Sequence, residues 1–351
     1  MKKVVIVGSN SIHCQRYIAG VIATGEFDVS LISNQKMSEF ANLNCLEVNF
    51  ALRNFNAVKQ IRAYLKSIQA DVVHIHQANS YAWHTLRALR KLTRRPKVVL
   101  TTWGSDVLIL PKQSKLMRRM VEYNLRHSDL ITSDSLFMSA QIAALLGKVS
   151  RPIHTLNFGM QNLPALIDVT SKHKIILSNR LHKPLYRVDK IIQAFATLIK
   201  NNLIDTEYRL VIAGSGEESA NLEQLAQDLS VSARINFVGM LNYSELVELY
   251  RHAQLFISVP ESDGTSSSLL EALAYGCIPV LSNLPANLEW VLDQVNGFIA
   301  PEVGQLQQQI LAAIQLSQNI VEYQKLGNFN HHMILEKASF SHNIRRFIEL
   351  Y

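Results

Sequence analysis

The sequence predicts an α/β protein built from two doubly wound, Rossmann-like domains. Short apolar runs rich in β-branched residues alternate with segments of helical period, which is typical of parallel sheets covered by helices on both faces. The alternation is interrupted once near the middle of the chain and then resumes. At 351 residues, with 48% hydrophobic and 18% charged residues, the chain is long enough for two cores.

Five predicted strands precede the interruption, and amphipathic segments separate them. They are residues 3–8, 27–33, 71–76, 97–104 and 129–135. The interruption itself falls within 158–174, where Gly159, Asn162 and Pro164 break the rhythm as a linker would. Residues 1–163 are therefore predicted to form an N-terminal domain.

The second set of predicted strands follows the same pattern. Its members are residues 174–180, 208–216, 234–239, 255–260 and 277–283. Residues 164–337 are predicted to form the C-terminal domain, and no convincing sequence repeat relates it to the first. Ligands of open parallel sheets bind beyond the carboxyl ends of the strands, so we expect an interdomain cleft lined by the residues that follow those strands.

Composition excludes several classes of protein. No apolar run approaches the roughly 18 to 20 residues of a membrane span, and the first residues lead directly into a strand, which predicts a cytoplasmic protein. Cys14, Cys45 and Cys277 have no metal-ligand or CxxC spacing, so neither a disulfide framework nor a structural zinc site is expected.

The two halves of the chain differ in charge. Residues 1–163 hold 21 Lys and Arg against 9 Asp and Glu, whereas residues 164–351 hold 14 against 19. Much of the basic excess lies in "RALRKLTRRPK" (87–97) and "KQSKLMRR" (112–119). These segments are either solvated helix faces or the binding surface for an anionic partner such as phospholipid or nucleic acid.

The stretch "DGTSSSLLEALAYG" (263–276) follows a predicted strand and opens a predicted helix. Gly264 permits a tight turn, and the small residues after it leave the backbone amides at the helix start accessible to an anion. Asp263 and Glu271 can then flank one ligand and accept hydrogen bonds from vicinal hydroxyls, as a sugar nucleotide would require. The alternative is that the serines cap the helix and that Glu271 only interacts favourably with the helix dipole. The candidate donor-binding residues from this stretch are Asp263, Gly264, Thr265, Ser266, Ser267 and Glu271.

Two other loops after predicted strands carry candidates for phosphate binding. Arg180, Lys183 and Arg187 cluster after the strand at 174–180. Gly214 and Gly216 follow the strand at 208–216, where a turn without side chains lets backbone approach a ligand, although an ordinary strand-to-helix turn explains them as well.

A family resemblance unites these features. Residues 234–301, with Asp263 and Glu271 in a carboxylate-x7-Glu motif, "EALAYGCIPV" and "NLEWV" followed by "NGFIAP", resemble the donor-binding half of the retaining GT-B glycosyltransferases of family 4. "SNSIHCQRYIAGVI" and "TTWGSDVL" resemble the family's N-domain loops, so the likeness extends over nearly the whole chain.

The resemblance implies a function and a set of roles. The chain would transfer a sugar from a nucleotide diphosphate sugar to an acceptor hydroxyl with retention, in cell-surface polysaccharide or glycolipid synthesis, without a metal or other cofactor. Glu271 would hold the ribose, Asp263 the hydroxyls of the donor sugar, and Arg180 the pyrophosphate. The C-terminal domain would bind the donor and the N-terminal domain a glycan or lipid-linked acceptor, with the helix at about 338–351 packed back onto the N-terminal domain.

Three positions depart from the family pattern. The first motif carboxylate is usually Glu, and Asp263 is one methylene shorter. The family's pyrophosphate lysine aligns near Tyr186 or Arg187, which leaves Lys183 or Arg187 as its substitute. Trp103 replaces a histidine of the N-domain, so Asp106 becomes the better catalytic candidate there.

The acceptor side is predicted from loops of the N-terminal half. Its candidate residues are Ser9, His13, Arg16, His76 and Trp103. His74 and His76 share one face of a strand, and we interpret them as residues at the ligand-binding end of that strand or in satisfied hydrogen bonds in preference to a metal pair.

Rival functions remain at this point. A nucleotide-sugar epimerase has the same fold, and a non-enzymatic binder of anionic polymers would explain the basic half but not the motif. A dehydrogenase is disfavoured because "GSNS" lacks the later glycines of a dinucleotide fingerprint. The expected partners are the nucleotide sugar, the acceptor and an anionic membrane surface that makes the protein peripheral at the inner face, with no nucleic acid.

Overall fold

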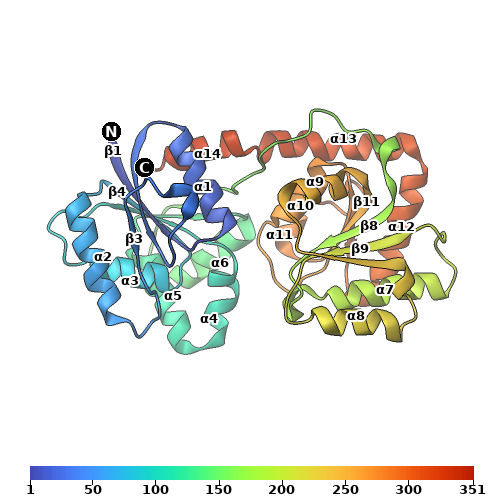
Figure 1. Ribbon diagram of the computed structural model, residues 1–351, viewed down its shortest axis with the longest axis horizontal. Helices are drawn as coiled ribbons and strands as arrows, with labels where there is room; N and C mark the ends of the chain where they lie inside the picture. Colours follow the sequence, from blue (N-terminus) through green and yellow to red (C-terminus); the bar gives the residue numbers. More distant parts are fainter. The chain divides into compact units, whose positions relative to one another are not determined.

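The computed structural model describes residues 1–351, which divide into two compact units. The N-terminal unit comprises Met1–Phe158 together with Phe340–Tyr351, and the C-terminal unit comprises Gly159–Ser339. Each unit holds one parallel sheet with helices on both faces, as the alternating pattern predicts (Figure 1). The first segment of the N-terminal unit ends at Phe158, whereas the sequence predicted a domain boundary after residue 163.

The sheet of the N-terminal unit has seven strands in the order β3-β2-β1-β4-β5-β6-β7. Its strands are β1 (Lys2–Gly8), β2 (Phe27–Ser33), β3 (Cys45–Glu47), β4 (Val72–His76), β5 (Lys97–Thr101), β6 (Leu130–Ser133) and β7 (Ile153–Thr155). Its helices are α1 (Ile12–Ala23), α2 (Phe55–Ile68), α3 (Ser80–Leu89), α4 (Leu110–Gln113), α5 (Lys115–His127), α6 (Leu136–Leu146) and α14 (Phe340–Ile348). Because every pair is parallel, the carboxyl ends of these strands share one edge.

Alternate residues of β1 serve two different cores. Val5 and Val7 pack with residues of α2, α3, α5 and α6, whereas Val4 and Ile6 pack with residues of α1 and α14. The C-terminal helix thus completes the second face of this sheet, and its Phe347 is buried there.

The last residue of the chain joins a buried polar network under that face. The Tyr351 hydroxyl lies 2.7 Å from the Tyr17 hydroxyl and 2.7 Å from His74 Nδ1, and His74 Nε2 lies 2.6 Å from Thr101 Oγ1. Burial, with a smaller effect of His76, lowers the pKa of His74 well below its usual value, so the ring is neutral. The Tyr351 hydroxyl is therefore the atom that links His74 Nδ1 to the Tyr17 hydroxyl.

Removing that hydroxyl should destabilise the N-terminal unit. Tyr351→Phe leaves both His74 Nδ1 and the Tyr17 hydroxyl without this partner, which should lower the free energy of unfolding by about 1–3 kcal/mol. Tyr17→Phe is the matched control, because it leaves the Tyr351–His74 contact in place and should cost less. Urea denaturation of both variants measures the difference, and an equal or larger loss in Tyr17→Phe would contradict this account.

The C-terminal unit has six parallel strands in the order β10-β9-β8-β11-β12-β13. They are β8 (His173–Asn179), β9 (Arg209–Ala213), β10 (Ile235–Gly239), β11 (Ala253–Ser258), β12 (Ile278–Ser282) and β13 (Phe298–Ala300). The helices are α7 (Val188–Lys200), α8 (Ser219–Asp228), α9 (Tyr243–His252), α10 (Ser267–Ala274), α11 (Pro285–Leu288), α12 (Leu306–Gln318) and α13 (Ile320–Lys337). The short helical turns of the whole chain are η1 (Ser38–Phe40), η2 (Ser105–Ile109), η3 (Val169–Ser171), η4 (Pro184–Tyr186), η5 (Ser232–Arg234) and η6 (Val303–Gln305).

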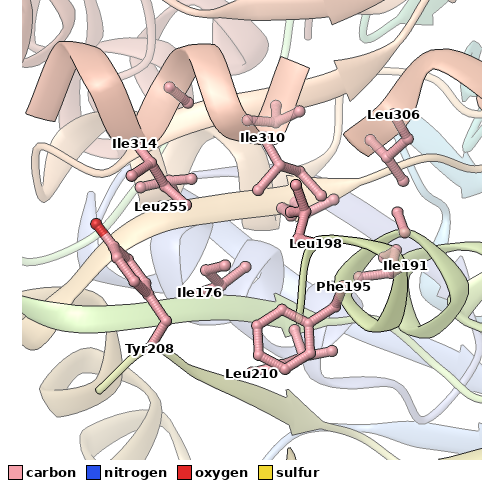
Figure 2. Close-up of a cluster of buried hydrophobic side chains, with 14 of the residues drawn as sticks. Ile176, Ile191, Phe195, Leu198, Tyr208, Leu210, Leu255, Leu306, Ile310 and Ile314 are labelled. Atoms are coloured by element: carbon pink, nitrogen blue, oxygen red, sulfur yellow. The ribbon is translucent and has the colours of Figure 1, made fainter. Parts of the chain in front are cut away.

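Two cores hold this second sheet, one on each face. On one face, Ile176 and Leu255 pack against Phe195 of α7 and Ile310 of α12 (Figure 2). On the other face, Phe256 packs with residues of α9, α10 and α13. The central strands β1, β4, β5, β11 and β12 are buried on both sides, which is why they are continuous apolar runs in the sequence. None of the helices combines the length and hydropathy that a membrane span needs.

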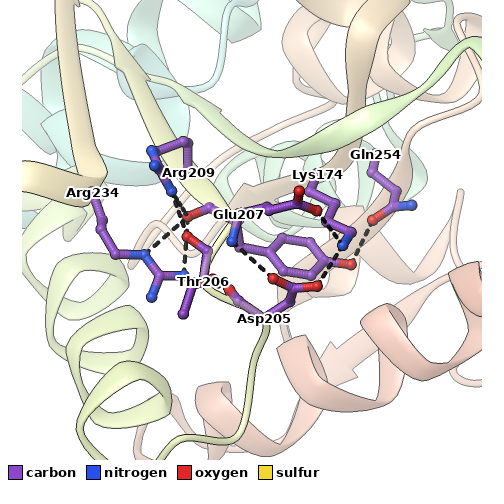
Figure 3. A network of polar contacts seen from close by, with 8 residues as sticks. Lys174, Asp205, Thr206, Glu207, Arg209, Arg234 and Gln254 are labelled. Carbon is purple, nitrogen blue, oxygen red and sulfur yellow. Dashed lines mark hydrogen bonds and ion pairs between the residues drawn. The ribbon is translucent and has the colours of Figure 1, made fainter.

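A polar network fastens the amino ends of the strands in the C-terminal unit (Figure 3). Lys174 Nζ contacts Asp205 Oδ2 at 2.5 Å and Glu207 Oε2 at 2.6 Å, and Arg234 donates to the carbonyl of Asp205 at 2.5 Å. Lys174 belongs to β8, and the two carboxylates lie in the turn before β9. These charges are therefore at the edge opposite the carboxyl ends of the strands.

Three strands escape prediction from the sequence. β3, β7 and β13 have three residues each and lie at the edges of the two sheets. A run of three residues cannot establish a period of two, and an edge strand needs no continuous apolar run. All of the longer strands coincide with predicted ones.

Candidate functional site

Arg180 follows β8 directly and is held by three side chains. Its Nη2 donates to Asp263 Oδ2 at 2.6 Å, its Nη1 donates to the Ser266 hydroxyl, and its guanidinium carbon lies 4.4 Å from the ring centroid of Tyr186. The side chain of Arg180 is 9% exposed. The structure thus brings together two carboxyl-edge loops, after β8 and after β11, around one guanidinium.

Ser266 precedes α10 as its N-cap residue, but its hydroxyl does not cap the helix. It makes no capping hydrogen bond and accepts from Arg180 instead. The neighbouring residues are engaged locally, because the Gly264 amide donates to Asp263 Oδ1 at 3.1 Å and Thr265 Oγ1 accepts from Trp290 at 3.2 Å. Ser267 is the first residue of α10 and is exposed. The helix cap alone therefore does not explain the hydroxyl residues of this stretch.

Glu271 lies in α10 and is 6% exposed. It adjoins Tyr250 of α9, and burial together with this carboxylate raises the pKa of the Tyr250 phenol well above its usual value. The Tyr250 hydroxyl also accepts from Asn179 Nδ2 at 2.8 Å and donates to the Ser268 carbonyl at 3.3 Å. Because Asn179 ends β8 and Arg180 follows it, two consecutive residues serve both predicted carboxylates: Arg180 contacts Asp263 directly, and Asn179 contacts the Tyr250 hydroxyl beside Glu271.

Lys183 and Arg187, the two candidates for the role of the family's pyrophosphate lysine, differ in their surroundings. Arg187 has a left-handed backbone with φ of 49°, and its guanidinium donates to the carbonyls of Val259 at 2.6 Å and Pro260 at 2.8 Å. Lys183 is exposed and forms no ion pair with any carboxylate. Arg187 therefore supports the loop after β11, and Lys183 is the cation that can still move toward a ligand.

Gly214 and Gly216 allow two loops to pass at very short range. A Cβ at Gly214 would lie 2.3 Å from the Arg180 carbonyl oxygen, and one at Gly216 would lie 2.3 Å from that of His182. Their amides donate to Gly239 O at 2.7 Å and Ser219 Oγ at 3.0 Å. The two glycines therefore shape the loop that carries Arg180, and both amides are already used.

The N-terminal unit has its own group of candidates at the carboxyl edge of its sheet. Asp106 is buried, and its two oxygens accept the amides of Ala78 at 2.6 Å and Trp103 at 2.9 Å. Burial raises the pKa of the Asp106 carboxyl, although the backbone hydrogen bonds oppose that shift. The geometry makes Asp106 the residue that joins the loops after β4 and β5, and a catalytic role for it stays a prediction.

Aromatic rings gather beside that loop. Trp103 packs edge-on against His13 and His76, at centroid distances of 5.7 Å in both cases, and lies 5.6 Å from Phe158. Burial lowers the pKa of His76 to about 3, and neither ring nitrogen of His76 has a hydrogen-bond partner. Three of the five predicted acceptor-side residues thus form one cluster.

The other two acceptor-side residues lie nearby in the chain. The Ser9 hydroxyl donates to that of Ser11 at 3.2 Å, in the loop between β1 and α1, and Arg16 is in α1. His74 is committed to Tyr351 and Thr101, in agreement with its interpretation as a satisfied histidine. Sequence reasoning missed Tyr250 and Asn179, because nothing in the local pattern of α9 or β8 distinguishes a residue that supports a carboxylate from one that fills the core.

Comparison with protein families resolves the class of protein. Residues 165–331 match the family described as "Glycosyl transferases group 1", and residues 3–135 match "Glycosyl transferase 4-like". The chain belongs to the group 1 glycosyltransferases. This group 1 enzyme is therefore a nucleotide-sugar glycosyltransferase of a retaining family, as the carboxylate-x7-Glu motif predicted.

Individual relatives are distant. The N-acetyl-alpha-D-glucosaminyl L-malate synthase of Bacillus anthracis is 24% identical over 267 residues, which cover 73% of this chain and 68% of that protein. An uncharacterized glycosyltransferase of Methanocaldococcus jannaschii is 24% identical over 83% of this chain and 81% of its own length.

Solved structures establish the fold. A glycosyltransferase from Rickettsia africae ESF-5 has a TM-score of 0.82 at 16% identity, covering 100% of this chain and 97% of its own. An Anabaena protein in complex with UDP-glucose has a TM-score of 0.79 at 12% identity, covering 99% of each chain. The two Rossmann-like units of this group 1 glycosyltransferase are those of the GT-B fold.

Proposed function

We propose that this enzyme transfers a hexosyl group from a nucleotide diphosphate sugar to a hydroxyl of a glycan or lipid-linked acceptor, in the synthesis of a cell-surface polysaccharide or glycolipid. The C-terminal unit binds the donor, and the N-terminal unit binds the acceptor. The observation that carries this proposal is the Arg180 guanidinium, which Asp263, Ser266 and Tyr186 hold beside the start of α10.

Arg180 acts on the leaving group. As the bond between the sugar and the diphosphate breaks, negative charge grows on the phosphate oxygen, and a fixed cation stabilises that charge without reorganising. Amides in the first turn of α10 add partial positive charge at the same place. Because the charge on the leaving oxygen is larger in the transition state than in the bound donor, Arg180 stabilises the transition state more than the ground state.

The two carboxylates divide the remaining work. Glu271 accepts hydrogen bonds from the ribose hydroxyls, and its contact with Tyr250 keeps it in position. Asp263 keeps its Oδ2 on Arg180, and its Oδ1, which also accepts from the Gly264 amide, accepts a hydrogen bond from a hydroxyl of the donor sugar. In the N-terminal unit, the cluster of Trp103, His13 and His76 forms the acceptor side, and Asp106 fixes the loop that carries Trp103.

The names of relatives suggest which donors to test first. One curated relative is an N-acetyl-alpha-D-glucosaminyl L-malate synthase, and another, from Streptococcus pneumoniae, is an alpha-monoglucosyldiacylglycerol synthase. Solved neighbours of similar fold are complexes with UDP, UDP-glucose or GlcNAc. UDP-glucose and UDP-N-acetylglucosamine are therefore the leading donor candidates.

Donor binding should raise the stability of the enzyme. A nucleotide sugar present at about 100 times its dissociation constant adds roughly 2.7 kcal/mol to the free energy of unfolding, which gives a clear rise in melting temperature. Thermal shift assays with UDP, GDP and ADP sugars would identify the base and the sugar. Incubation with the preferred donor alone should leave its sugar configuration unchanged, since epimerisation without an acceptor would favour the rival enzyme class. A panel without any stabilising nucleotide would reject the proposed function.

A further inference from the structure

The two basic segments of the N-terminal unit differ in how their charges are used. In the segment 87–97, Arg94 pairs with Asp71 at 2.6 Å and Arg95 pairs with Asp129 at 2.9 Å. Arg87 lies over the ring of Trp83, with 5.1 Å between the guanidinium carbon and the ring centroid. Several of these cations therefore have partners within the fold, although the sequence shows only six basic residues within eleven positions.

The segment around α4 and the first turns of α5 is the opposite case. Lys112, Lys115 and Arg119 are exposed, and none of them forms an ion pair with a carboxylate. Only Arg118 has such a partner, Glu122, at 2.9 Å. No acidic residue occurs between positions 107 and 121, so the surface keeps an uncompensated positive charge.

An exposed apolar side chain lies within this charge. Leu116 is 69% exposed and is flanked by Lys115 in the same helical turn. The buried face of α5 is made by other residues, among them Met120 and Val121, so Leu116 is not required for the core. The segment 87–97 has no large apolar side chain with comparable exposure.

A cavity of about 540 Å³ adjoins the same corner. Its apolar lining includes Val107 and Leu145, and its polar lining includes Lys112, Lys115 and Arg118. A volume of this size is in the range of small-molecule sites, and the combination of apolar wall and cations suits a phosphate attached to hydrocarbon.

We propose that the α4–α5 corner, residues 110–119, binds the anionic phospholipid surface of a membrane. The unpaired cations attract lipid phosphates, the cavity accepts one headgroup, and Leu116 enters the boundary between headgroups and acyl chains. Single-stranded nucleic acid is a poorer match, because its bases stack on exposed aromatic rings and residues 110–119 contain no aromatic side chain.

The corner also follows the acceptor-side cluster closely along the chain, as an acceptor that resides in a membrane would require. Trp103 ends the loop after β5, η2 follows at Ser105–Ile109, and α4 begins at Leu110, so few residues separate the acceptor-side cluster from Lys112. The biological role of this membrane contact rests on the proposed function, since it assumes a lipid-linked acceptor. The binding of lipid itself can be measured without any donor.

The test is sedimentation of the full-length chain with vesicles. Each cation near an anionic surface contributes about fivefold to binding, so Lys112→Ala/Lys115→Ala/Arg119→Ala should weaken the partition onto phosphatidylglycerol-rich vesicles about a hundredfold at low salt. Arg87→Ala/Arg90→Ala/Lys91→Ala is the matched control, because it removes the same charge from the other basic segment. This control variant should weaken binding by less than about tenfold, because it lowers only the overall positive charge of the protein. Phosphatidylcholine vesicles should bind neither protein.

A second variant keeps the test independent of charge. Leu116→Ser retains every cation and should still lower vesicle binding several-fold, because burial of an apolar side chain in the interface is lost. Equal losses in the two triple variants, full binding by Leu116→Ser, or displacement of the protein from vesicles by an oligonucleotide at equal charge concentration would each overturn the proposal. Melting temperature and UDP binding of every variant report folding and the donor site separately, so a failure of the proposed function would leave the vesicle result interpretable.

Discussion

Arg180→Ala should lower kcat about a hundredfold to a thousandfold, which is the usual loss when one preorganised group that stabilises developing charge is removed. The Arg180 side chain is nearly buried and contacts Asp263, Ser266 and Tyr186. No other cation makes these contacts, so none can take over its role. Arg187 cannot replace it while its guanidinium donates to the carbonyls of Val259 and Pro260.

The conservative variant separates charge from geometry. Arg180→Lys retains a positive charge but loses the planar fork that reaches Asp263 and Ser266 together, so it should recover only a small part of the activity. Arg209→Ala is the control, because Arg209 is in the same unit but contacts the Thr206 carbonyl at the amino edge of the sheet (Figure 3). Steady-state rates at saturating donor measure the effect, and activity of Arg180→Ala within tenfold of the wild type would remove Arg180 from the mechanism.

The sequence predicted the parts of the fold that depend on long local patterns. Continuous apolar runs identify strands that are buried on both faces, and the stretch after β11 identified Asp263, Ser266 and Glu271 because a turn, a helix start and spaced carboxylates are all local features. The three-residue edge strands lack such a pattern. Their existence follows from pairing with β2, β6 and β12, which no local property of the strand itself encodes.

Contacts between distant residues explain what the sequence left open at the site. Lys183 and Arg187 were equivalent as cations in a loop, and only the carbonyls of Val259 and Pro260, more than seventy positions away, distinguish them. In the same way, Arg94 and Arg95 look like unpaired cations in the sequence, but in the structure they form ion pairs with Asp71 and Asp129. Composition counts such charges, but it does not show which of them are neutralised in the folded chain.

Glu271 and Asp263 should respond differently to mutation, because one carboxylate is assigned to the unreactive ribose and the other to the reacting sugar. Glu271→Ala should weaken free UDP and the UDP-sugar alike, by about 1.5 to 3 kcal/mol for a charge-assisted hydrogen bond. Glu271→Gln keeps the shape of the buried side chain beside Tyr250 and serves as the control for folding.

Asp263→Ala should leave UDP affinity nearly intact and lower kcat. The ion pair with Arg180 makes this the more demanding case, because removing Asp263 also releases the guanidinium from one of its two hydrogen-bonded partners. A released cation can follow the diphosphate and so bind free UDP at least as well, while its loss of orientation weakens the stabilisation of the leaving group in the transition state. Titration of UDP by calorimetry and turnover at saturating donor would decide between the two roles. Parallel losses of UDP affinity and kcat in both variants would mean that the carboxylates act as one unit, and full activity in Asp263→Ala would reject the contact of Asp263 with the reacting sugar.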